Sequence, residues 1–174
     1  MPCGTREIRA RGIMSNMSPF TPRELRDALG RFATGVTVIT TRAETGPLGI
    51  TANSFASVSL DPPLVLWMPA KSSGRYAPFT RAQRFAIHVM AADQHEISDG
   101  FVREGNIFDR LDVTWAEDGT PLLRDCLARF HCERWAVHDA GDHAIVLGRV
   151  MDAVHRDGDP LVFSSGRYGS FSGD

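Results

Sequence analysis

Val36-Thr37-Val38-Ile39-Thr40-Thr41 is an unbroken run of β-branched residues in the first third of the chain. Side chains branched at Cβ favour extended backbone, so this run predicts a strand. Glu44-Thr45-Gly46-Pro47 then predicts a turn, and residues 48–54 return as a second strand. Together the two runs indicate a β-hairpin.

Short strands and tight turns continue along the rest of the chain. Further strands are predicted over residues 57–60, 64–68, 85–90, 127–137, 143–155 and 161–163. Turn-forming residues at 61–63, 139–142 and 157–160 separate several of them. Few helices stand between the strands, which disfavours a parallel doubly wound sheet. The pattern favours a mainly β fold, an antiparallel barrel with peripheral α-helices.

The first predicted helix opens at Thr21-Pro22-Arg23-Glu24, a capping box with proline at the first helical position. Apolar residues then recur with helical spacing, and Gly35 ends the pattern. These apolar residues are Leu25, Ala28, Leu29 and Phe32.

Two more helices are predicted further along the chain. A second capping box at Asp93–Glu96 opens a helix that runs to about residue 103, with Ile97 and Phe101 facing inward. Residues 73–81 predict a short helix, and residues 104–120 predict a long loop without periodicity.

Composition and charge exclude several classes of protein. The 174 residues and 19.1 kDa suit one domain. Hydrophobic residues make up 43% and charged residues 23%, which excludes a disordered chain. A net charge of −2 argues against a nucleic-acid-binding protein. The longest apolar run, residues 64–68, is far shorter than the roughly 20 residues that cross a bilayer.

The termini and cysteines indicate a cytoplasmic protein. Residues 1–18 are basic but lack the apolar core of a signal peptide, so they are interpreted as a tail and residues 19–174 as the domain. Cys3, Cys126 and Cys132 form neither a CxxC pair nor an even disulfide framework. They are interpreted as reduced, structural thiols.

Short polar residues gather at the end of the second predicted strand. Thr51-Ala52-Asn53-Ser54 is followed by Ser57 and Ser59. Their hydroxyl and amide groups, with exposed backbone N–H groups, suit a ligand rich in hydrogen-bond acceptors. The alternative is a polar strand end stabilised by local hydrogen bonds.

Two other segments combine cations with short or aromatic side chains. Lys71-Ser72-Ser73-Gly74-Arg75 suits a phosphate group near a helix start, the alternative being a solvated loop. Gly166-Arg167-Tyr168 suits an aromatic or anionic ligand, the alternative being a packed terminus.

Two histidines and two aspartates lie close together in His138-Asp139-Ala140-Gly141-Asp142-His143. Such side chains are metal ligands in other proteins, but a tight turn directs these ones apart, so no metal site is predicted. His143 alone is expected to line a pocket at the start of its strand. The sequence contains no GxGxxG, P-loop, GxSxG or HExxH motif.

Six segments in register carry a resemblance to a known family. The chain resembles the flavin reductase family, the small NAD(P)H:flavin oxidoreductases that serve two-component monooxygenases. The resemblance covers about residues 21–171. The six segments are LGRFATGVTVITT at 29–41, GITANSF at 49–55, SVSLDPPLV at 57–65, FAIHV at 85–89, GDH at 141–143 and GRY at 166–168.

The resemblance implies an FMN-binding split β-barrel that forms a homodimer. It implies FMN or FAD as the flavin, NADH or NADPH as the hydride donor, and His143 as the residue beside the nicotinamide. His88 stands where many members carry Asn. The cofactor-binding residues implied are Thr51, Ala52, Asn53, Ser54 and Ser57 at the flavin ring and ribityl chain, Lys71, Ser72 and Ser73 at its phosphate, His88, and Arg167 and Tyr168 at the edge of the pocket.

The implied reaction is hydride transfer from nicotinamide to flavin, with the reduced flavin passed to a flavin-dependent monooxygenase. Stacking and orientation of the two rings suffice for this chemistry, so neither a catalytic triad nor a Rossmann motif is needed. One alternative is a flavin- or haem-binding module with little reductase turnover. Another is an oxidase of the pyridoxamine-phosphate type, which is disfavoured because no basic cluster exists beyond Lys71 and Arg75.

Overall fold

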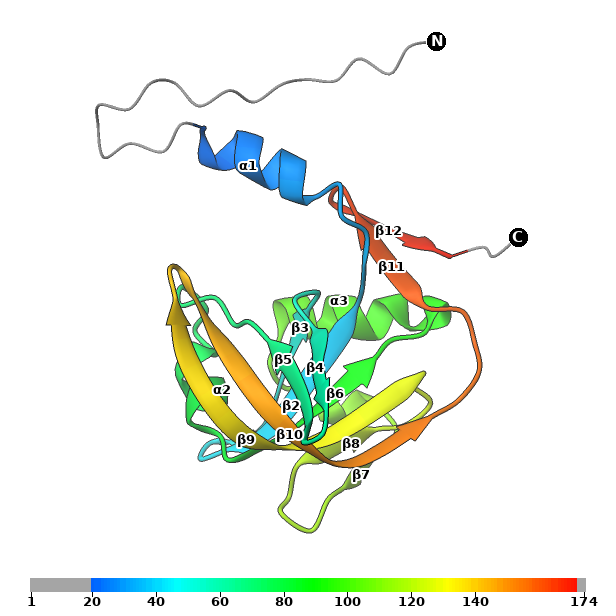
Figure 1. The fold of residues 1–174 in the computed structure, drawn as a ribbon. Helices are drawn as coiled ribbons and strands as arrows, with labels where there is room; N and C mark the ends of the chain where they lie inside the picture. Colours follow the sequence, from blue (N-terminus) through cyan, green and yellow to red (C-terminus); the bar gives the residue numbers. More distant parts are fainter. Residues whose placement is uncertain (1–19, 172–174) are drawn as a thin grey trace.

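The computed structural model describes residues 20–171, so the predicted tail and Cys3 lie outside the described residues. Strands dominate (Figure 1), which confirms the mainly β prediction. Three helices are present among the described residues: α1 (Pro22–Leu29), α2 (Tyr76–Arg81) and α3 (His95–Arg103). The strands are β1 (Thr34–Gly35), β2 (Thr37–Ala43), β3 (Gly46–Ala52), β4 (Ala56–Leu60), β5 (Pro63–Trp67), β6 (Arg84–Val89), β7 (Val113–Trp115), β8 (Pro121–Leu123), β9 (Ala128–Ala140), β10 (His143–His155), β11 (Leu161–Ser164) and β12 (Arg167–Ser170).

Seven strands form one curved antiparallel sheet in the order β3-β2-β6-β9-β10-β5-β4. The predicted hairpin is confirmed, because β2 pairs with β3 and places Ile39 opposite Ile50. The two edge strands, β3 and β4, are consecutive in the chain and are joined by residues 53–55. Two small sheets complete the fold, β1-β11-β12 and β7-β8. This arrangement is a split β-barrel.

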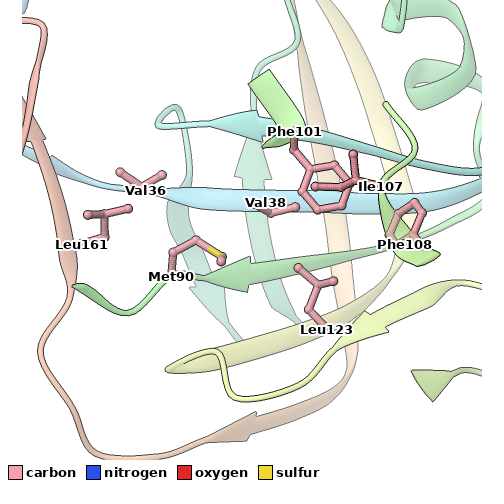
Figure 2. Packing of buried hydrophobic residues seen from close by; sticks show 8 residues of the cluster. All are labelled: Val36, Val38, Met90, Phe101, Ile107, Phe108, Leu123 and Leu161. Atoms are coloured by element: carbon pink, nitrogen blue, oxygen red, sulfur yellow. The ribbon is translucent and has the colours of Figure 1, made fainter. Parts of the chain in front are cut away.

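Two apolar clusters lie on the two faces of β2, because successive side chains of a strand point to opposite faces. Val38 belongs to the cluster drawn in Figure 2, where Phe101 of α3 packs over β2. Ile39 belongs to the second cluster, with Trp67 and Phe85 inside the barrel. Residues 36–41 are all buried, and the hydroxyl groups of the three threonines in this run each donate to a backbone carbonyl oxygen.

The first helix begins as predicted, but its apolar side does not pack against the rest of the described chain. Thr21 and Glu24 make the reciprocal hydrogen bonds of a capping box. However, α1 buries none of its residues: Leu25, Leu29 and Phe32, just beyond its end, are 38%, 66% and 78% exposed. Figure 1 shows α1 standing apart from the large sheet, near the turn between β11 and β12.

Three local predictions need correction. Asp93 does not cap α3; a 3₁₀ turn over Ala92–Gln94 precedes the helix, and the Gln94 amide oxygen accepts from the Ala91 N–H. The predicted loop over residues 104–120 contains a second 3₁₀ turn, Phe108–Arg110, as well as β7. The predicted helix over 73–81 begins only at Tyr76.

The prediction that His88 contacts the cofactor is also corrected, because this side chain is fully buried in the core. Its Nδ1 lies 2.9 Å from the Val38 carbonyl oxygen, and its Nε2 accepts a hydrogen bond from the Leu123 N–H at 3.1 Å. A ring that donates at Nδ1 and accepts at Nε2 is neutral. His88 therefore links β2 and β6 to β8.

The two described cysteines are buried free thiols, in accordance with their interpretation as structural residues. Burial raises the pKa of Cys132 to about 12, so this thiol stays protonated. No helix among residues 20–171 is long and apolar enough to cross a membrane.

The neutral His88 ring predicts a loss of stability in mild acid. Burial lowers the pKa of His88 to about 4, from 6.5 for an ordinary histidine. The unfolded chain therefore takes up a proton first, and the free energy of unfolding falls as the pH drops from about 6.5 to about 4. The slope from one proton is at most about 1.4 kcal/mol per pH unit.

Urea denaturation at several pH values measures this effect. We expect His88→Gln to have a shallower decrease in the free energy of unfolding over this range than the wild type. His155→Gln, which changes an exposed histidine, should keep the wild-type slope. Equal slopes for the wild type and His88→Gln would contradict the assignment.

Candidate functional site

A hollow of about 220 Å³ lies where the sheet is split. Its walls are the end of β3, the connection to β4, the end of β5 with the loop that follows, and the start of β10. The lining residues are Ile50, Thr51, Ala52, Asn53, Ser54, Trp67, Met68, Pro69, Ala70, Ser73 and His143. The structure thus brings together the predicted residues 51–54, Ser73 and His143.

Hydrogen bonds from two of these residues hold the β3 side of the hollow against β5 and α3. The Ser54 hydroxyl donates to the Met68 carbonyl oxygen at 3.1 Å and accepts from the Met68 N–H at 3.0 Å. This pair links the β3–β4 connection to the end of β5. The Thr51 hydroxyl donates to the Ser98 carbonyl oxygen of α3 at 2.6 Å. Both hydroxyl hydrogens are therefore used within the protein.

Other polar groups of the hollow remain available to a ligand. The Asn53 amide is exposed and has no hydrogen-bond partner among residues 20–171. Trp67 is fully buried, and its indole N–H has no acceptor within the described part of the chain. The indole nitrogen itself has almost no accessible surface, so this donor belongs to the core and is not offered to a ligand in the hollow.

The lining carries no carboxylate, ammonium or guanidinium group, and His143 is its one ionisable side chain. Short polar groups, backbone and apolar side chains suit an uncharged planar ring with acceptors at its edge. They fit a flavin ring system. Within residues 20–171, no group of three His, Cys, Asp or Glu side chains is placed to hold a metal ion.

The two cations of the segment 71–75 are bound to the protein itself. The Arg75 guanidinium donates to the Gly49 carbonyl oxygen at 3.0 Å and to carbonyl oxygens at the C-terminal end of α3, those of Phe101 and Val102. The Lys71 ammonium donates to Asp139 and to the Gly141 carbonyl oxygen. The Ser73 hydroxyl oxygen accepts a hydrogen bond from the Arg75 N–H, so the hydroxyl hydrogen remains free to donate to a ligand.

His143 is held at the edge of the hollow by its neighbour in the β9–β10 hairpin. The Asp142 carboxylate lies 2.8 Å from Nδ1 of the imidazole. The hydrogen bond with His143 lowers the pKa of Asp142, so this carboxylate stays charged. Nε2 has no partner among residues 20–171 and is available to a ligand.

Besides Lys71 and His88, four predicted residues do not line the hollow. Ser57 and Ser72 are exposed outside it. Arg167 is exposed on β12, and Tyr168 packs edge-on against His95, with ring centroids 4.3 Å apart. Within one chain the small β1-β11-β12 sheet thus holds Arg167 and Tyr168 away from the hollow.

Sequence reasoning missed the apolar wall made by residues 67–70. They lie at and just beyond the end of a strand that the sequence predicts over residues 64–68, and only the hydrogen bonds between Ser54 and Met68 place them beside Asn53. No spacing in the sequence signals this contact.

A second, larger and more open hollow of about 380 Å³ lies at the other end of β9, around Arg124 and Cys126. It contains none of the residues predicted to bind a cofactor. Its mix of exposed arginine and aspartate side chains lacks the enclosed, uncharged walls that a ring needs. We therefore assign the candidate site to the smaller hollow.

Comparison with known proteins shows the family to which the chain belongs. The family described as "Flavin reductase like domain" matches residues 29–172, and the chain belongs to this family. Over 164 residues it is 56% identical to "FMN reductase (NADH) SmoA" of Agrobacterium fabrum, covering 91% of this chain and 94% of that protein.

Two further matches extend the comparison. The reductase component of the flavin-dependent trigonelline monooxygenase of Acinetobacter baylyi is 51% identical over 132 residues. These cover 74% of this chain but only 42% of that protein, so the chain spans less than half of its length. The structure of Streptomyces globisporus NADH:FAD oxidoreductase SgcE6 superposes with a TM-score of 0.84 at 35% identity, covering 92% of this chain and 99% of that one.

The free amide of Asn53 and the bonded hydroxyl of Ser54 predict different effects of substitution. Asn53→Leu should weaken flavin binding at least several-fold, because a lost buried hydrogen bond costs roughly 1–3 kcal/mol. Its melting temperature should stay near the wild-type value. Ser54→Ala should instead lower the free energy of unfolding by roughly 1–3 kcal/mol, because Met68 loses both partners.

Flavin fluorescence quenching and thermal unfolding of the two variants measure these effects. A folded Asn53→Leu variant with wild-type flavin affinity would show that the ring binds elsewhere.

Proposed function

We propose that this protein is an NADH-dependent flavin reductase, which transfers hydride from the nicotinamide to FMN or FAD and supplies reduced flavin to a partner monooxygenase. The observation that carries the proposal is the uncharged hollow at the split of a flavin reductase-like barrel. The printed names of its relatives, an NADH-dependent FMN reductase and a monooxygenase reductase component, support the same activity.

A bound flavin supplies the hydride acceptor in this reaction. The contribution of the protein is to hold and orient the two ring systems. Asn53 and the backbone of residues 51–54 bind the edge of the flavin ring, while Trp67 and Met68 form an apolar wall. The His143 imidazole, oriented by Asp142, binds the nicotinamide at Nε2. No side chain is needed to move a proton for the hydride step.

We also propose that the protein is a homodimer, because two apolar surfaces have no cover within residues 20–171. One is the exposed side of α1 with Phe32. The other lies on the outer sheet face, where Leu147 stands opposite Leu66 and Ala136, and where Trp135 and Met151 are each 53% exposed. Exposed apolar surfaces of this kind mark protein–protein interfaces. A second copy would cover both.

The compartment proposed is the cytoplasm. Support comes from the buried free thiols of Cys126 and Cys132, which suit a reducing environment.

The proposed function predicts that NADH oxidation by the purified protein accelerates strongly when FMN is added. His143→Ala should raise the KM for NADH or slow flavin reduction by about 1–2 kcal/mol in the transition state, with a much smaller change in flavin affinity. His138→Ala, on the same hairpin but outside the hollow, should behave as the wild type.

Stopped-flow reduction of the flavin-loaded protein measures both quantities. An NADH oxidation rate that does not respond to FMN would favour a flavin-binding module over an enzyme. Loss of flavin binding in His143→Ala with normal NADH kinetics would show that this residue serves the flavin.

The proposed dimer predicts sedimentation at twice the chain mass of 19.1 kDa. Phe32→Glu places a charge on the proposed interface and should shift the protein toward monomer at micromolar concentration. Val102→Glu, at an exposed apolar residue of α3, is the control and should remain dimeric. A monomeric wild type with full activity would contradict the proposal.

A further inference from the structure

The loop that follows β5 runs beside the start of β10 and is joined to it by an isolated β-bridge. Ala70 forms a β-bridge with His143, and the Ala144 N–H donates to the Pro69 carbonyl oxygen at 3.1 Å. The Lys71 N–H donates to the Asp142 carbonyl oxygen at 2.8 Å. The backbone of residues 69–71 therefore contacts the hairpin on the β10 side.

The Lys71 side chain extends this contact across the hairpin. Its ammonium donates to the Gly141 carbonyl oxygen in the turn at 2.6 Å and forms an ion pair with Asp139 near the end of β9. Lys71 thus contacts the end of β9 and the turn, while residues 69 and 70 contact the start of β10. His143, which lines the hollow, begins the second strand.

The same contacts occupy two of the three N–H donors of the ammonium. Lys71 is not among the residues that line the hollow, and the partners of the ammonium among residues 20–171 both belong to the hairpin. The neighbouring cation, Arg75, is likewise bound to carbonyl oxygens of β3 and α3. A phosphate at Lys71 would therefore compete with Asp139 for the ammonium.

We propose that Lys71 and Asp139 form a clamp that fixes the His143 hairpin at the edge of the hollow. Lys71 is then a positioning residue for the nicotinamide side of the site, and not the cation that binds the flavin phosphate. The functional part of this inference rests on the proposed function. The structural part, the tethered hairpin, does not depend on it.

Lys71→Met removes the charge but keeps most of the apolar stem, and Asp139→Asn removes the opposite charge. Each variant should raise the KM for NADH by roughly two- to fivefold, the range expected for an exposed ion pair, with little change in kcat. The double variant should equal the single variants, because both remove the same interaction. The charge-swapped Lys71→Asp/Asp139→Lys variant should recover part of the loss.

Two measurements do not depend on turnover. Backbone amides of residues 140–144 should exchange hydrogen faster in both single variants of the flavin-free protein. The ratio of the dissociation constants for FMN and riboflavin, which lacks the phosphate, should match the wild type. Asp112→Asn, which breaks the exposed ion pair with Arg124 beside the β7–β8 sheet, is the control and should change neither quantity.

Two results would overturn the clamp. A selective loss of FMN affinity in Lys71→Met, with riboflavin unchanged, would show that Lys71 binds the phosphate. Unchanged amide exchange in residues 140–144 would show that the ion pair does not hold the hairpin. If the wild type fails to reduce flavin with NADH, the proposed function fails, while amide exchange still decides whether the clamp exists.

Discussion

Residues 53–55 join the two edge strands of the seven-stranded sheet, so β3 and β4 are connected by the chain and not by a backbone ladder. The Ser54 hydroxyl bridges this split by donating to and accepting from the backbone of Met68. An open split leaves backbone groups and short side chains facing a hollow. The position of the candidate site follows from this single constraint, because the hollow lies where residues 51–54 come close to residues 67–70.

The charges near the hollow are arranged to hold the protein together and leave the hollow neutral. Arg75 binds the C-terminal end of α3, and Lys71 binds the β9–β10 hairpin. Asp142 holds His143 in place. A neutral hollow with a positioned imidazole at its edge favours recognition of flat ring systems over recognition of phosphate. This agrees with a reaction in which orientation of two rings is the main requirement.

Much of the fold could be predicted from local patterns, since the β-branched run over residues 36–41 and the turn after it specify their hairpin directly. The failures occur where a tertiary contact decides the outcome. The family resemblance implies that His88 binds the cofactor, yet its ring is buried and bonded to two backbone groups. Phe32 follows a helical apolar pattern that has no partner within residues 20–171. Tyr168 is drawn to His95 by a small sheet that pairs residues far apart in the chain.

Binding of the flavin ring in the smaller hollow is the central claim, and NMR tests it most directly. Riboflavin, which offers the ring without the phosphate, is titrated into ¹⁵N-labelled protein. The account predicts that the largest amide shift changes fall on residues 51–54, 68–73 and 143. Changes concentrated on residues 123–129, around the larger hollow at the other end of β9, would contradict it.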